Sequence, residues 1–196
     1  LLALKPPTPS MLLASLALFL MATNPVEVIW PTYAKPMLDE RYANTAIGTL
    51  TAGYFFAIAF GAALSPYISR VFRRRHAVTL AVLFSCLAGV QVALAMQGDI
   101  AGFIGVFLVY SVLLGASETP ASSILHRCVA DRQRSTMLSL RSLIQQLGAA
   151  LGLVLAGAVA DIYSTPIAWS VGALFLLIAM VLSLGLAKRL TRSPAS

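Results

Sequence analysis

Residues 77–96 read AVTLAVLFSCLAGVQVALAM, twenty consecutive residues without a charge, directly after Arg73, Arg74, Arg75 and His76. Twenty mostly apolar residues are enough to cross the hydrocarbon core of a bilayer as one helix. Basic residues beside such a run are typical of the cytoplasmic end of a span. This stretch therefore predicts a membrane helix.

Five more apolar runs of similar length fill most of the remaining sequence. The predicted spans are residues 11–31, 46–68, 77–96, 100–125, 135–160 and 166–187, forming a bundle over 11–188 with a Pro-rich linker at 1–10 and a tail at 189–196. Of the 196 residues, 59% are hydrophobic and 11% are charged, against about a quarter charged in a soluble domain. This composition excludes a disordered chain, an ordinary soluble enzyme and a nucleic-acid-binding domain. We predict an all-α membrane protein with six transmembrane helices.

The basic residues orient these spans. Of 14 Lys and Arg, 11 fall on the side of both chain ends, only Lys35 and Arg41 fall on the other side, and Arg141 lies within a span. The positive-inside rule then places both termini in the cytoplasm. The chain begins with Leu1 rather than Met, so we expect a fragment or the second half of a longer protein.

The six spans differ in character, and the differences repeat after three helices. Residues 46–68 and 135–160 carry ridges of small residues, including Gly53, Gly61, Gly148 and Gly152, which favour close packing against other helices. Gly and Ala are also simply common in membrane helices. Residues 77–96 and 166–187 have no ionisable group in their cores and are expected to face lipid.

The remaining two spans are polar and are expected to line a cavity, because ionisable side chains in a membrane usually face water or a partner. Their polar residues include Asn24, Glu27, Tyr110, Ser117, Glu118 and Thr119. The order of cavity-lining, buried and lipid-facing helices thus occurs twice. This repetition predicts two inverted three-helix repeats, as found in transporters.

The loop after the second span carries a family signature in partial form. Residues 65–74 read SPYISRVFRR, which resembles the motif Gly-x-x-x-Asp-Arg-x-Gly-Arg-Arg of the major facilitator superfamily. Arg70, Arg73 and Arg74 match, whereas Ser65, Ser69 and Phe72 replace Gly, Asp and Gly. Residues 145–152, QQLGAALG, are similar to the eleventh helix of bacterial drug exporters. The whole layout resembles the C-terminal six-helix half of such a transporter.

This resemblance implies secondary active transport of small molecules, namely proton-coupled efflux by alternating access. The implied partners are a substrate, protons, the lipid bilayer of a bacterial inner membrane, and an N-terminal six-helix half. Arg70, Arg73 and Arg74 would belong to a gating loop, although the Asp of the intact motif is lost. The alternatives are proton-coupled uptake of a metabolite, or a self-contained six-helix protein that acts as a homodimer or an assembly factor.

Three ionisable residues within the spans are the main candidates for this chemistry. A carboxyl group in a low-dielectric cavity can carry a proton near neutral pH, so Glu27 is the candidate for proton coupling, unless it lies solvated at the outer interface. Glu118 either carries protons or forms an ion pair with Arg141 at an inner gate. The side chains of Asn24, Tyr110, Ser117 and Thr119 could bind a substrate by hydrogen bonds.

Motifs of enzymes are missing from the sequence. It contains no His-Glu-x-x-His, no Gly-x-Ser-x-Gly and no phosphate-binding Gly-rich loop with Lys. His76 and His126 are too isolated to bind a metal. Arg73, Arg74 and Arg75 are expected to anchor the chain and to favour anionic lipid headgroups. We therefore predict neither enzymatic activity nor a cofactor.

Overall fold

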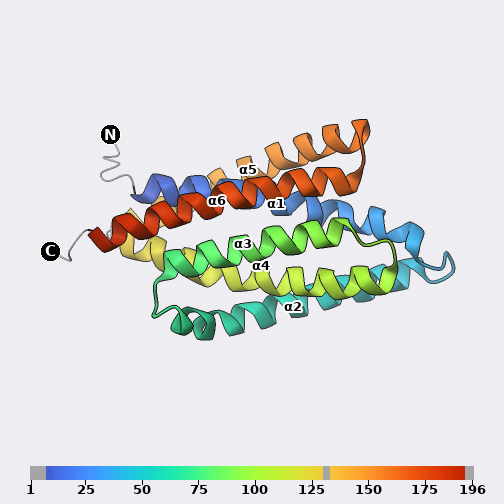
Figure 1. Cartoon of the computed structure of the whole chain (residues 1–196), viewed down its shortest axis with the longest axis horizontal. Helices are drawn as coiled ribbons and strands as arrows, with labels where there is room; N and C mark the ends of the chain where they lie inside the picture. Colours follow the sequence, from blue (N-terminus) through green and yellow to red (C-terminus); the bar gives the residue numbers. More distant parts are fainter. Residues whose placement is uncertain (1–7, 130–132, 193–196) are drawn as a thin grey trace.

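The computed structural model describes residues 8–129 and 133–192 of the chain. Six long helices make up almost all of this part, which contains no strand (Figure 1). They are α1 (Thr8–Ala34), α2 (Ala43–Val71), α3 (His76–Ala95), α4 (Ile100–Cys128), α5 (Arg134–Ile162) and α6 (Thr165–Arg192), with a 3-10 turn, η1 (Lys35–Met37), after α1. All six are long and apolar enough to cross a membrane, which confirms the predicted all-α membrane fold.

Most helices extend beyond the predicted spans. Residues 8–10 of the predicted linker form the first turn of α1, where Pro9 is tolerated because the first N–H groups of a helix have no partner within it. Pro31 does not end this helix, which continues to Ala34; proline is tolerated inside membrane helices. Residues 1–7 of the linker and 193–196 of the tail lie outside the described residues.

The packing of the helices follows the predicted inverted repeats. α1 and α4 are central: α5 and α6 pack on α1, α2 and α3 pack on α4, and α3 packs along α6. Exchanging α1 with α4, α2 with α5 and α3 with α6 leaves this pattern unchanged. The exchange is imperfect in one place, because α5 packs on α6 more closely than α2 packs on α3. Both ends of the described chain lie at the same end of the bundle (Figure 1).

Matching glycines bring the outer helices directly against the central ones. Gly61 of α2 lies on the carbonyl group of Val112 in α4, and Gly148 of α5 lies on that of Ala17 in α1, with no room for a Cβ atom at either. Each glycine begins a Gly-Ala-Ala-Leu segment. Small residues let helix backbones approach closely in a membrane. These two ridges therefore pack inside this chain, at equivalent places in the two repeats.

A proline in α4 frees a carbonyl group that α2 then satisfies. Pro120 has no N–H, so the carbonyl of Ala116 lacks the donor that would normally come from the next turn of the helix. Ser65 Oγ donates a hydrogen bond to this oxygen at 2.7 Å, and both residues are fully buried. The serine that replaces the glycine of the loop motif thus binds an orphan backbone acceptor.

The equivalent place in α1 has the same proline and a different partner. Pro25 leaves the carbonyl of Met21 without its helical donor. This oxygen lies against Gly152 of α5, which follows Gly148 by one helical turn as Ser65 follows Gly61. The two repeats therefore share the freed carbonyl, but among the described residues only Ser65 supplies a side-chain donor to it.

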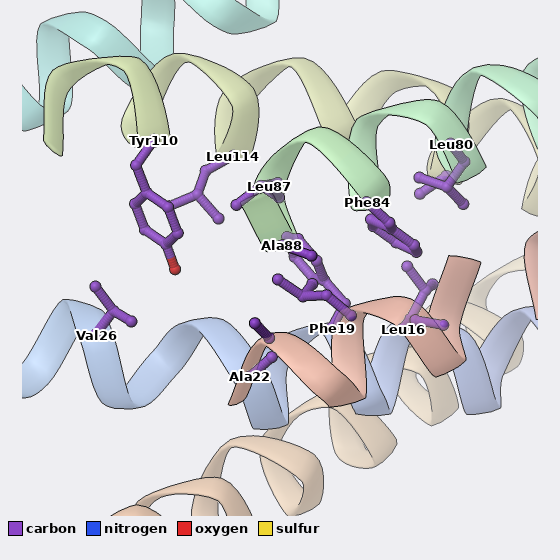
Figure 2. Close-up of a cluster of buried hydrophobic side chains, with 14 of the residues drawn as sticks. Leu16, Phe19, Ala22, Val26, Leu80, Phe84, Leu87, Ala88, Tyr110 and Leu114 are labelled. Carbon is purple, nitrogen blue, oxygen red and sulfur yellow. The ribbon is translucent and has the colours of Figure 1, made fainter. Parts of the chain in front are cut away.

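The core lies between α1, α3, α4 and α6 (Figure 2). Phe19 of α1 stacks on Phe84 of α3 with ring centroids 5.1 Å apart, and Leu16, Leu80 and Leu87 are buried beside them. α3 is the most enclosed of the six helices. The prediction that it faces lipid is therefore wrong for most of its surface, because an apolar side chain packs equally well on protein or on lipid.

α2 and α5 are the least enclosed helices. The parts of their small ridges at Gly61 and at Gly148 and Gly152 are buried, as expected. Much of the remaining surface is exposed, and Phe55, Phe56 and Phe60 are each more than half exposed. On α5, exposed apolar side chains include Leu143, Leu147, Leu151 and Val154. Gly53 is not part of a tight contact, because a Cβ atom there would lie 3.5 Å from Leu108 Cδ2, an ordinary distance.

Candidate functional site

A polar bridge joins α1 to α2, two helices that share few other contacts. The Tyr54 hydroxyl donates a hydrogen bond to Glu27 Oε2 at 2.9 Å. The Tyr54 ring stacks on Phe107 of α4 with centroids 5.7 Å apart, and Phe107 in turn contacts Trp30 of α1 at 4.9 Å. These aromatic contacts fix the ring, so the hydroxyl is held against a half-buried carboxylate within a membrane-spanning helix.

A second polar bridge joins α4 to α5, which also share few other contacts. Arg141 donates to Glu118 Oε1 at 2.6 Å, to Ser122 Oγ at 2.9 Å and to Gln145 Oε1 at 3.0 Å. The Arg141 side chain is only 8% exposed, whereas that of Glu118 is 59% exposed. A buried guanidinium requires such partners. The structure thus forms the ion pair that was one of the two interpretations of Glu118.

The two bridges occupy equivalent places in the repeats. Tyr54 and Arg141 each lie seven residues before the glycine of a Gly-Ala-Ala-Leu segment, and Glu27 and Ser122 each lie two residues after the proline of a central helix. The Tyr54–Glu27 contact therefore corresponds to the Arg141–Ser122 contact. In both repeats, the central helix is linked to the next helix along the chain by a polar contact at the same register, and in the second repeat the Arg141–Glu118 ion pair is added to it.

The other polar residues of the two central helices divide into buried and accessible ones. Tyr110 is fully buried and its hydroxyl donates to the carbonyl of Thr23 at 3.4 Å. Ser117 is also buried and donates to a carbonyl of its own helix at 2.8 Å. Neither hydroxyl is presented to a substrate in this structure, because both already bond to the backbone. Asn24 and Thr119 remain partly exposed.

The loop between α2 and α3 is closed by arginines rather than by a glycine. Arg73 (φ 51°) and Arg74 (φ 56°) adopt left-handed backbone conformations, and the Arg74 N–H donates to the carbonyl of Ser69 at 2.7 Å. Phe72, at the second Gly position of the motif, has an ordinary φ of −87°. Arg70 is exposed, and the buried Ser69 hydroxyl has no partner among the described residues. The left-handed residues of this turn are therefore Arg73 and Arg74, and not Phe72 at the second Gly position of the motif.

The sequence profile of the Major Facilitator Superfamily matches residues 10–196, a range that reaches all six helices. The chain belongs to this superfamily. Major facilitators transport small molecules across membranes and are not enzymes, so the chain is an integral membrane protein with a small molecule as its substrate. Comparison with curated proteins gives no match.

Tyr54, Ser122 and Gln145 are residues of this major facilitator site that the sequence analysis did not identify. A tyrosine in an apolar helix is most often a packing residue, and nothing adjacent to Tyr54 marks it as different. The sequence nevertheless contained a signal for Tyr54. When the two repeats are aligned on their Gly-Ala-Ala-Leu segments, Tyr54 is paired with Arg141. An intramembrane arginine is a functional candidate, and its repeat partner shares its position in the fold.

Proposed function

We propose that this chain is the C-terminal six-helix half of a proton-coupled major facilitator that exports small, partly apolar molecules by alternating access. The observation that carries the proposal is the hydrogen bond from Tyr54 to Glu27, 2.9 Å long, within the membrane-spanning part of the bundle. Ionisable groups in such segments are costly and usually serve function. Glu27 would be the residue that binds and releases the coupled proton.

The chemistry of this bridge supports a link between proton binding and helix position. A hydrogen bond to a carboxylate is charge-assisted and roughly twice as strong as one between neutral groups. When Glu27 takes up a proton, its carboxylate becomes a neutral acid and the bond from Tyr54 loses that assistance. Proton uptake would therefore loosen the contact between α1 and α2, and proton release would restore it.

The second bridge would act as a gate on the opposite side of the membrane. Equivalent positions of inverted repeats lie in opposite halves of the bilayer, so a contact at Arg141 and one at Tyr54 hold different ends of the bundle together. Arg141 donates hydrogen bonds to three side chains, whereas the Glu118 side chain remains 59% exposed. Opening this end would require breaking the ion pair, while the Tyr54–Glu27 contact is intact or loosened according to proton occupancy.

The apolar surfaces of α2 and α5 would be covered by an N-terminal six-helix half or by a second copy. Residues such as Phe56, 78% exposed, and Val154, 71% exposed, form a contact surface for either partner. We propose a bacterial inner membrane with both termini in the cytoplasm, because the loop of Arg73, Arg74 and Arg75 between α2 and α3 lies at the end of the bundle where the described chain begins and ends (Figure 1). The mass of the protein in detergent shows whether the partner is an N-terminal half in the same chain or a second copy. Reporter proteins fused to the two termini test the orientation in the membrane.

The experiment is transport by the full-length protein in proteoliposomes with an imposed pH gradient, using a panel of cationic dyes and drugs. We expect Glu27→Gln to abolish gradient-driven export while substrate exchange without a gradient continues. Tyr54→Phe should keep export at a reduced rate, since the carboxylate remains. Glu40→Gln is the matched control, because Glu40 is an exposed acid in the turn before α2.

Gradient-driven export by the Glu27→Gln variant at the rate of the unmodified protein would refute the role of Glu27. If a substrate moves in the same direction as the protons, instead of against them, the function is proton-coupled uptake and not export. An absence of transport for every compound, together with a stable homodimer in detergent, would favour the self-contained six-helix protein.

A further inference from the structure

A basic cavity lies between the start of α3 and the last turns of α4 and α6. These helix ends lie at the end of the bundle where the described chain begins and ends (Figure 1). Its volume is about 450 Å³. Five basic side chains line it: Arg74, Arg75, His76, Arg127 and Lys188. No Asp or Glu is among the described residues that line it. A hollow with this charge attracts an anion.

The start of α3 adds positive potential to the same cavity. The helix begins at His76 without a side-chain cap, and its first residues line the hollow, so the positive end of the helix dipole lies there. The buried His76 Nδ1 atom has no hydrogen-bond partner among the described residues. The left-handed conformation of Arg74, φ 56°, folds the end of α2 back so that this side chain joins the lining. Such a turn is unfavourable for a residue other than glycine.

The remaining walls of the cavity are apolar and continue into an exposed apolar face. Ile124 of α4 and Leu184 and Leu190 of α6 line the cavity. From Leu184, one side of α6 continues as exposed Val181, Ile178 and Leu174, spaced three and four residues apart. Residues at this spacing share one side of a helix. The charged hollow is therefore joined to an apolar strip along the direction of the membrane normal.

We propose that this cavity binds the phosphate group of an anionic phospholipid, with an acyl chain lying along the exposed face of α6. A free phosphate ion would use the basic side chains and the start of α3, but it would gain nothing from Leu184 and the apolar strip. A lipid uses both, and basic hollows between membrane helices are suited to anionic headgroups. Among the described residues, the cavity shares no lining residue with either polar bridge, although Ile124 in its wall lies two residues after Ser122 of the second bridge. The proposed lipid site therefore does not use the residues of the proposed proton chemistry.

The test is native mass spectrometry of the full-length protein in detergent, titrated with phosphatidylglycerol or phosphatidylcholine of the same chain lengths. We expect phosphatidylglycerol to bind at least about tenfold more tightly. The double variant Arg75→Gln with Arg127→Gln should lose this preference. The double variant Lys35→Gln with Arg41→Gln is the matched control, because it removes two positive charges from the opposite end of the bundle and should keep the preference.

Three outcomes would overturn the proposal: equal binding of the two lipids by the unmodified protein, an unchanged preference in the Arg75 and Arg127 variant, or loss of the preference in the control as well. Inorganic phosphate distinguishes the source of the anion. If it displaces phosphatidylglycerol at concentrations comparable to those of the lipid, the site is one for a soluble anion. This competition, and the comparison of the two lipids, need only the unmodified protein and remain decisive if the double variant fails to fold.

Discussion

The hydrogen bond between Ser65 and the Ala116 carbonyl can be tested by removing one hydroxyl group. Ser65 and Ala116 are both fully buried, so water cannot replace the donor. The variant Ser65→Ala leaves a buried acceptor unpaired, since Pro120 supplies no N–H. A hydrogen bond between membrane helices contributes about 1 kcal/mol, and an unpaired buried acceptor costs about 1–3 kcal/mol. We expect the free energy of unfolding to fall by roughly 1–2 kcal/mol.

The decisive step is to repeat the substitution in a background that restores the helical donor. Pro120→Ala returns an N–H to the position that faces the Ala116 carbonyl. In that background, Ser65→Ala removes a redundant donor, and its cost should fall to near zero. The coupling energy between the two substitutions should therefore be close to the full cost of Ser65→Ala in the unmodified protein.

The measurement is denaturant-induced unfolding in detergent micelles, followed by tryptophan fluorescence. Trp30 and Trp169 are both buried, with 4% and 1% of their surfaces exposed, so their emission reports on loss of the core. Ser183→Ala is the control. Ser183 is as buried as Ser65, but its hydroxyl donates to the Ala179 carbonyl of its own helix, which keeps its backbone donor.

The reasoning fails if Ser65→Ala costs the same in the Pro120→Ala background as in the unmodified protein. That result would mean that the hydroxyl contributes by packing alone and does not substitute for the missing N–H. A cost for Ser183→Ala as large as that for Ser65→Ala would lead to the same conclusion.

Three further predictions follow from the packing, the ion pair and the loop. Gly148→Ala should lower the free energy of unfolding by about 1–3 kcal/mol through overpacking, measured in micelles against Gly157→Ala, where a Cβ atom meets open space. Glu118→Gln and Arg141→Gln should be non-additive by about 0.5–1 kcal/mol, a modest value because solvent screens the exposed carboxylate; strict additivity in the double-mutant cycle would exclude an energetically coupled pair. Arg73→Gly should raise the unfolding free energy by about 1 kcal/mol, because glycine adopts the left-handed conformation without strain, and an unchanged or lower melting temperature would count against strain in this turn.

The six helices could be predicted from the sequence because length and hydrophobicity alone define a membrane span. The small ridges were also informative, since Gly61 and Gly148 admit close approach of a backbone whatever the partner helix. These patterns do not show whether the remaining surface of a helix contacts lipid or another helix. Uniformly apolar α3 has the same composition whether it contacts lipid or, as here, the neighbouring helices α4 and α6.

The polar residues show which features of the site could not be predicted from the sequence. Tyr110 and Ser117 were predicted to line a cavity, but they share one side of α4 with Leu114 at helical spacing, and all three are buried. That side of α4 is a core face in this structure. The partner of Glu27 could not be identified from its own helix, because Tyr54 reaches it from α2. The direction of a side chain across a helix pair depends on packing angles that no local pattern encodes.

The two freed carbonyl groups make the repeats mechanically unequal. At Ala116, separating α2 from α4 breaks a directional bond and strands an acceptor in a dry interior. At Met21, α5 presents bare Gly152, and a small slide of one backbone along the other changes only dispersion contacts, which vary gradually with distance. The α2–α4 pair therefore resists relative displacement more strongly than the α1–α5 pair. We expect a deformation of this bundle to displace α5 along α1 before it displaces α2 along α4.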